Sequence, residues 1–387
     1  MSEAATTHDS APPAARSEWI WSPAFDLVVG CGAWSLPLLG VVVLAGASRN
    51  AAIALAFYAL SIVCNYPHYM ATLYRAYRTR AEFTKYKLFT LHITAILVAT
   101  AVFVHWSPGW APLFFTIYVT WSPWHYTGQN FGIAMMFARR GGASPTRADR
   151  NWLYTAFAAS YALIFLALHT GASDEPYVLS LGLPEGFSRG ASALCLVVFA
   201  VAAARAVWRL VGQAGVRAMT PPLVVLSTQF LWFVLPTIVI NWFGYKLERT
   251  SYSVGALAFM HCAQYLWITS FYARREAEER HERWRPWVYA TALVAGGIAL
   301  FIPGPWIVSY ALHYDFTATF LIFGALVNIH HFVVDGAIWK LRDSRVAGLL
   351  LGSDADTIND RPWTASLPGL VRGGAVVAVV ALVCLAA

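Results

Sequence analysis

Long apolar segments separated by short polar ones are the feature of this sequence that most limits how it can fold. A helix needs about 20 apolar residues to cross a lipid bilayer. Only 12% of the residues are charged, whereas a soluble domain averages about 25%. We therefore predict an all-α, polytopic membrane helix bundle of about 10–11 transmembrane helices. The candidate segments are 25–47, 51–75, 88–106, 110–137, 152–170, 190–210, 222–243, 251–273, 286–303, 316–340 and 366–386.

The beginning of the chain differs from the rest. Residues 1–20 are rich in Ala, Ser, Thr and Pro, which predicts a disordered cytoplasmic tail. They lack the hydrophobic core and cleavage site of a signal peptide. We interpret 21–387 as a single transmembrane domain. The five cysteines form no CxxC motif, so neither structural disulfides nor thiolate zinc sites are expected.

The net charge of +7 comes from basic clusters that follow alternate apolar segments. Arg75 closes the second segment and Arg78 follows it, and Arg139 and Arg140 follow the fourth, while the intervening loops hold few basic residues. This alternation is the orientation signal of membrane proteins and outweighs a nucleic-acid interpretation. It predicts a protein of the bacterial inner membrane with a cytoplasmic N-terminus and no nucleic-acid partner.

Histidines lie upstream of the basic ends of four segments that should run in the same direction. They are His68, His125, His261 and the pair His330–His331. At 1.5 Å per residue, they lie about 10–20 Å from the cytoplasmic ends of their helices. We expect these histidines to meet inside the bilayer, with His92 of the third segment as a further contributor.

Other polar residues surround these histidines in the sequence. Polar groups are costly in a bilayer and usually functional, and imidazole is the commonest metal ligand. A single histidine in a membrane helix more often forms a hydrogen bond to a neighbouring helix. Several histidines at the same depth in the bilayer favour a metal site instead. Amides three to five residues from a histidine are candidates for further ligands or hydrogen-bond partners of the rings. These amides are Asn65, Gln129, Asn130, Gln264 and Asn328.

The choice of metal depends on the scarcity of carboxylates. Asp335 is the only acid well inside the segments near these histidines, and it lies one helical turn after His331. Carboxylate-bridged di-iron sites need about four acids. An imidazole-rich site with one carboxylate suits non-haem iron, then copper or zinc. Haem held by facing histidines is an alternative.

The His330–His331 pair and the distribution of histidines over several helices resemble the integral-membrane histidine-rich oxygenases. That class includes desaturases, alkane hydroxylases and bacterial carotene-cleaving dioxygenases. The resemblance implies an oxygenase, hydroxylase or desaturase that acts on a lipid or isoprenoid, with an electron-transfer partner. Desaturases carry HxxxH and HxxHH motifs, whereas this chain has Val327 in place of a histidine and no HxxxH. An eight-histidine di-iron site is therefore not expected.

A second resemblance, to haem–copper oxidases, rests on two motifs. His261-Cys-Ala-Gln-Tyr265 is similar to their H-x-x-x-Y element, and His330-His331-Phe332 is similar to their paired copper ligands. The last segment has no HxH to hold two haems, so this remains an alternative. A proton- or metal-coupled transporter is another, although we find no internal repeat. In the leading hypothesis, Asp335 and Tyr265 are catalytic, and Arg75 and Lys340 bind an anionic head group of the substrate.

Overall fold

The computed structural model describes residues 18–35, 37, 59–173, 177–243, 257–339 and 344–351. This part of the chain is almost entirely helical and contains no strand, which confirms the predicted all-α bundle. Two residues, Thr170 and Leu183, form an isolated β-bridge. The predicted segment 366–386 lies outside the described residues, as does the predicted tail 1–20 up to residue 17. Segments 25–47, 51–75, 251–273 and 316–340 lie partly outside them.

The longer helices are α4 (Tyr66–Tyr77), α6 (Thr94–Trp106), α7 (Ala111–Arg140), α8 (Arg147–His169), α9 (Glu185–Ala218), α10 (Thr220–Gln229), α11 (Leu235–Phe243), α12 (Leu257–Glu279), α13 (Pro286–Phe301), α14 (Pro303–Leu312) and α15 (Phe316–Ile338). The short helices are α1 (Pro23–Phe25), α5 (Arg80–Lys85) and α16 (Ser344–Leu351). Between them lie π-helical stretches, η1 (Asp26–Gly30), η2 (Ser61–Asn65), η3 (Leu88–Ile93) and η5 (Phe230–Val234), and the 3₁₀ turn η4 (Pro108–Trp110).

Six helical stretches of the described chain are long and apolar enough to cross a membrane. They coincide with six of the segments predicted from the sequence. Helices α7 and α12 are also long, at 30 and 23 residues, but do not belong to this set. The six stretches are Leu88–Trp106, Arg147–His169, Glu185–Ala218, Thr220–Val239, Pro286–Leu312 and Phe316–Ile338.

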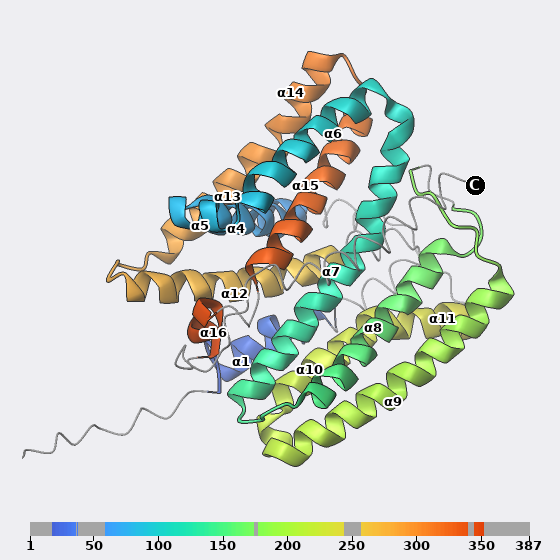
Figure 1. Cartoon of the computed structure of the whole chain (residues 1–387), viewed down its shortest axis with the longest axis vertical. Helices are drawn as coiled ribbons and strands as arrows, with labels where there is room; N and C mark the ends of the chain where they lie inside the picture. The colour runs from blue at the N-terminus through green and yellow to red at the C-terminus, as the bar shows by residue number, and fades with distance from the viewer. Residues whose placement is uncertain are drawn as a thin grey trace, which may run out of the picture.

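Helix α7 runs through the middle of the bundle, as Figure 1 shows. Helices α8, α9 and α10 lie on one side of it, and α6, α13, α14 and α15 lie on the other, while α12 crosses near the middle. The α7–α8 turn is well defined locally. Thr146 and Asp149 form a capping box, in which each side chain accepts a hydrogen bond from the other residue's backbone N–H.

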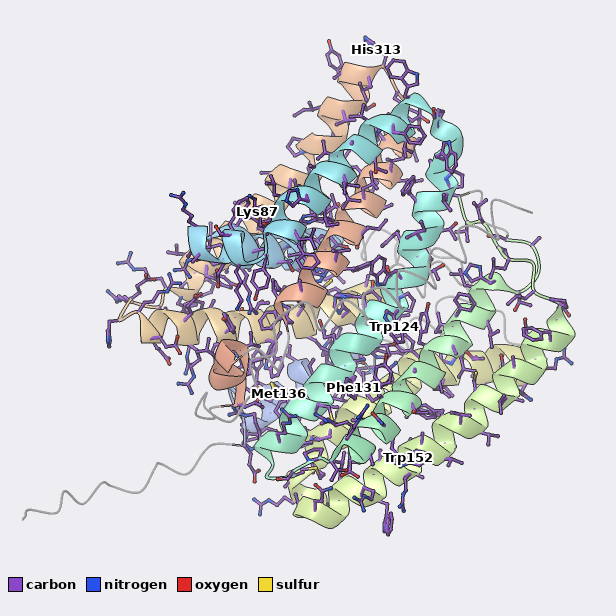
Figure 2. The ribbon with its side chains drawn as sticks, in the orientation of Figure 1. Lys87, Trp124, Phe131, Met136, Trp152 and His313 are labelled. Atoms are coloured by element: carbon purple, nitrogen blue, oxygen red, sulfur yellow. The ribbon has the colours of Figure 1, made fainter. Side chains whose placement is uncertain are left out.

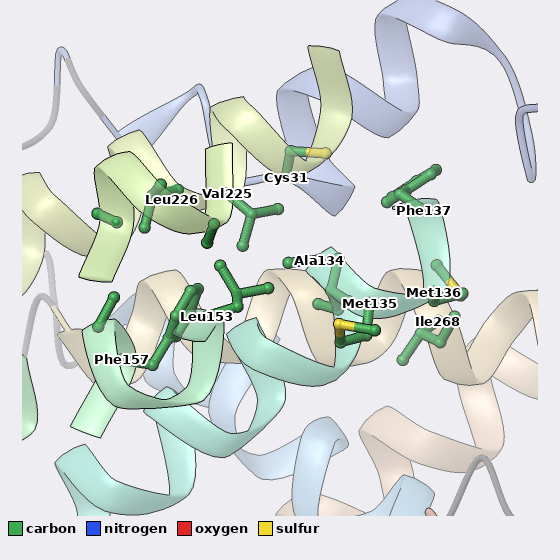
Figure 3. Packing of buried hydrophobic residues seen from close by; sticks show 14 of the residues in the cluster. Cys31, Ala134, Met135, Met136, Phe137, Leu153, Phe157, Val225, Leu226 and Ile268 are labelled. Carbon is green, nitrogen blue, oxygen red and sulfur yellow. The ribbon is translucent and has the colours of Figure 1, made fainter. Parts of the chain in front are cut away.

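The largest core cluster joins α7 to α8, α10 and α12. Figure 3 shows Met136 and Phe137 of α7 in this cluster with Phe157 of α8 and Ile268 of α12. A second close contact joins α13 to α4. A Cβ on Gly297 would lie 2.6 Å from the carbonyl carbon of Tyr66, so only glycine fits this approach. These contacts hold three of the helices that carry the histidines, α4, α7 and α12.

Candidate metal centre

Four of the predicted histidines converge at one point, each from a different helix. His68 comes from α4, His125 from α7, His261 from α12 and His331 from α15. One ring nitrogen from each lies within 4.8 Å of the others. The Nε2 atoms of His68 and His261 are 3.0 Å apart, and those of His331 and His125 are 3.2 Å apart. His68, His261 and His331 are at most 2% exposed.

The chemistry of these nitrogens fits a bound cation. A neutral imidazole has one N–H and one lone pair, so four rings bring several lone pairs into a small buried space. A tetrahedral zinc site with bonds of about 2.0–2.1 Å places its nitrogens about 3.4 Å apart, close to the two short distances here. The four-histidine cluster could therefore hold a metal ion.

A chain of hydrogen bonds fixes the orientation of His331. Tyr265 donates its hydroxyl proton to Oδ1 of Asp335 at 2.5 Å. Its oxygen lies 2.5 Å from Oγ1 of Thr72, so Thr72 must donate to it. Thr72 then accepts a hydrogen bond at 2.9 Å from Nδ1 of His331. This order protonates Nδ1 and leaves the Nε2 lone pair of His331 directed into the cluster.

Trp339 adds a further hydrogen bond to this chain, because its Nε1 donates to the Tyr265 hydroxyl at 3.0 Å. Asp335 also faces the cluster, with Oδ2 lying 3.8 Å from Nε2 of His125. The two residues predicted as catalytic thus lie directly beside the histidines. Thr72 was not predicted, since a threonine on another helix carries no periodic signal that would connect it with His331.

His68 is held by different partners. Its ring forms a hydrogen bond with the backbone of Asn65, one turn earlier. Its Nδ1 lies 3.5 Å from the thiol sulfur of Cys262, and that thiol donates to Oδ1 of Asn65 at 3.1 Å. Asn65 therefore lies in the shell around the cluster, as predicted, whereas Cys262 was not expected there.

The prediction that both histidines of the pair are ligands is wrong for His330. Its Nε2 lies 2.8 Å from Oγ1 of Thr94 and 3.4 Å from the hydroxyl of Tyr77. Adjacent residues of an α-helix point about 100° apart, so only one of the pair can face the cluster. His92, on η3, is exposed and does not belong to the cluster either.

Gln129 and Gln264 lie behind His261. The Nε2 atom of Gln129 donates to the Gln264 side chain at 3.1 Å and to the backbone carbonyl of His261 at 3.3 Å. Asn130 points away and donates to Gln229 at 2.8 Å, between α7 and α10. Asn130 was expected to be a further ligand or a hydrogen-bond partner of a histidine, but its side chain bonds to Gln229 instead.

Asn328 contacts the cluster through Tyr69. Its Oδ1 accepts a hydrogen bond from the Tyr69 hydroxyl. The Tyr69 ring packs against His68 and His331, with centroid distances of 4.6 and 5.2 Å. Asn328 thus positions an aromatic wall of the site.

One of the two predicted head-group residues, Arg75, is held between two aromatic rings. Arg75 stacks between Tyr272 and Trp339, at 4.0 and 3.8 Å from their ring centroids, and donates to the carbonyl of Ile338. It lines a small cavity of about 10 Å³, together with Tyr272 and Trp339. Lys340 lies outside the described residues.

A pocket of about 310 Å³ opens beside the cluster. Its polar side chains are His125, Gln129, Tyr265 and Asp335, apart from the indole N–H groups of its tryptophans. The rest of the lining is apolar or glycine and comes from α7, α12, α15 and α16, and from Trp339 directly after α15. Figure 2 shows two of these lining residues, Trp124 and Met136, well separated along α7. The candidate metal centre is thus open on one side to an apolar space.

Comparisons with protein-family models, with curated proteins and with solved structures find no match for this chain.

Proposed function

We propose that the protein is an integral-membrane metalloenzyme, a non-haem-iron oxygenase, hydroxylase or desaturase that acts on a lipid or isoprenoid. One observation carries the proposal: a buried four-histidine cluster opens into an apolar pocket. The reaction class takes dioxygen as the oxidant. Hydroxylation and desaturation also consume two electrons, which an electron-transfer partner would supply.

The donor set supports a transition metal. Four neutral imidazoles with one nearby carboxylate suit iron, copper or zinc and disfavour magnesium and calcium, which prefer oxygen ligands. Bound iron would supply dioxygen activation, which zinc cannot. The imidazole rings of His68 and His331 lie 4.2 Å apart, and those of His125 and His331 lie 4.9 Å apart. This spacing leaves no room for a porphyrin between them and weighs against haem.

The residues at the edge of the pocket have distinct roles in this proposal. Tyr265 and Asp335 share a proton at the point where the pocket meets the cluster. They would hold that proton near the reacting part of the substrate. The apolar lining would exclude water from the site and bind the hydrocarbon. His68, His125, His261 and His331 would hold the metal.

The setting in the membrane agrees with an apolar substrate that partitions into the bilayer. Six apolar helical stretches indicate a membrane protein. The cytoplasmic N-terminus and the bacterial inner membrane, inferred from the alternation of basic loops, belong to this proposal as well.

The adjacent histidines of α15 provide the test with a matched control. Metal analysis of purified wild-type protein should give about one iron per chain, as should His330→Ala, while His331→Ala should retain less than about a tenth. A visible spectrum should show no Soret band. Wild-type protein without stoichiometric metal, or equal losses in the two variants, would overturn the proposed site.

A second measurement separates an enzyme from a transporter. Wild-type protein in bacterial lipid extract, supplied with a reductant, should consume dioxygen, whereas His331→Ala should not. A loaded wild-type protein that never consumes dioxygen with acyl or isoprenoid lipids would support the metal-coupled transporter instead.

A further inference from the structure

One face of α7 forms a continuous wall of the pocket. The lining residues of this helix recur at alternating intervals of three and one positions, between Trp121 and Met136. At 1.5 Å per residue, this wall is about 22 Å long. The pocket of about 310 Å³ is therefore elongated along α7. Such a shape suits a single chain better than a compact ring system.

Two glycines lie on this wall beside the cluster. Gly128 and Gly132 are three and seven residues after His125, so all three share one face of α7. A Cβ added to either glycine would meet no atom within 4 Å. Glycine inside a helix costs about 0.5–1 kcal/mol relative to alanine, so these positions are not chosen for helix stability. Any larger side chain there would stand in the pocket.

Polar and apolar residues are unevenly distributed along the wall. His125 faces Asp335 near the Trp121 end. From His125 to Met136, α7 extends about 16 Å further. Apart from Gln129, this part of the pocket is lined by glycine and apolar residues, which include Ile133, Ile268 and Leu350. A ligand with its reacting carbon at His125 would therefore lay an apolar tail over the two glycines.

We propose that Gly128 and Gly132 determine substrate specificity by clearing a groove for one linear apolar chain. The chain extends at least about 16 Å past His125, along α7. The length of this groove then sets how far from the end of the chain the reaction occurs. The inference rests on the proposed function for the reaction, but the binding of the chain can be measured without it.

Photolabelling tests this proposal directly. The probes are a hexadecyl alcohol and an octyl alcohol, each with a diazirine in the chain, added to protein in lipid nanodiscs. A geranylgeranyl probe forms a second arm that distinguishes an isoprenoid from an acyl chain. Labelled residues are located by mass spectrometry, and only labels on the pocket face of α7 are counted, because outer faces also meet lipid.

Wild-type protein should be labelled on this face by the hexadecyl probe. In Gly132→Leu that labelling should fall about tenfold or more, while the octyl probe, which ends near Gly132, should still label. Gly132→Ala should give an intermediate loss of hexadecyl labelling. This variant replaces Gly132→Leu in the test if the leucine variant fails to fold. Gly190→Leu, at an exposed and equally open position of α9, is the matched control and should behave as wild type.

The proposal is overturned if Gly132→Leu labels with the hexadecyl probe as strongly as wild type. It is also overturned if labelling by both probes falls equally. Iron content is measured on the same samples and should be unchanged in all variants. If wild-type protein holds no iron but the labelling follows the expected pattern, the proposed function fails while the inference about the chain stands.

Discussion

Thr72 offers the sharpest test of how the cluster is held. Its hydroxyl lies between Nδ1 of His331, at 2.9 Å, and the hydroxyl of Tyr265, at 2.5 Å, and the residue is 1% exposed. Thr72→Val keeps the shape of the side chain and removes both hydrogen bonds. Tyr265 keeps its bonds to Asp335 and Trp339, but the Nδ1 proton of His331 loses its acceptor.

The expected effect on metal affinity follows from this geometry. Losing the outer hydrogen-bond partner of a ligating histidine weakens metal binding about 10- to 100-fold. This corresponds to about 1.4–2.7 kcal/mol. Thr72→Ser, which keeps the hydroxyl, should restore most of the affinity. Competition with a chelator of known affinity, followed by metal analysis, measures the change.

Thr319, on α15, provides the matched control. It is fully buried, and its hydroxyl has no hydrogen-bond partner among the described residues. Thr319→Val should therefore leave metal affinity unchanged, and any effect on folding should be neutral or stabilising. The reasoning is refuted if Thr72→Val binds the metal within a factor of about two of wild type, or if the control loses as much.

Two further predictions concern the carboxylate and the packing of the ligand helices. Asp335→Asn keeps an acceptor for Tyr265 but removes the carboxyl group that can hold a proton, 3.8 Å from His125. Iron content should therefore persist, while substrate-dependent dioxygen consumption should fall at least about tenfold. Complete loss of iron would instead make Asp335 a ligand. Gly297→Ala should push α13 from α4 and reduce stability by about 1–3 kcal/mol in thermal unfolding, because its Cβ would lie 2.6 Å from a backbone atom. Gly212→Ala, where a Cβ meets nothing within 4 Å, should be neutral or stabilising, and equal behaviour of the two variants would contradict the packing argument.

The bundle was largely predictable because the length of an apolar segment is a local property. Helices α7 and α12 show the limit of this signal. Both are helical where predicted, yet neither reaches the apolar threshold of the six other stretches. Each carries one of the converging histidines and a glutamine beside it. These polar side chains lower the mean hydropathy of α7 and α12, and mean hydropathy is the property by which a membrane span is recognised in a sequence.

The site itself was only partly predictable. Matched depth along parallel helices was enough to select His68, His125 and His261. Depth cannot separate His330 from His331, because that choice depends on how α15 is rotated about its axis. Thr72 and the pocket depend on packing between helices far apart in sequence, and no spacing in the chain encodes them. Arg75 has the positive charge that a ligand of an anionic head group needs. Its guanidinium group stacks on Tyr272 and Trp339, however, and does not line the pocket.

Four helices each supply a single histidine, and they are distributed from the beginning to the end of the described chain. No pair of them alone offers enough ligands for a tight site, so a metal ion would have little affinity for a partly assembled chain. Metal binding would then stabilise the fully assembled bundle relative to every folding intermediate. The free energy of this stabilisation would grow with the concentration of free metal. Metal supply during membrane insertion would thereby act as quality control, since only correctly assembled chains would retain the ion.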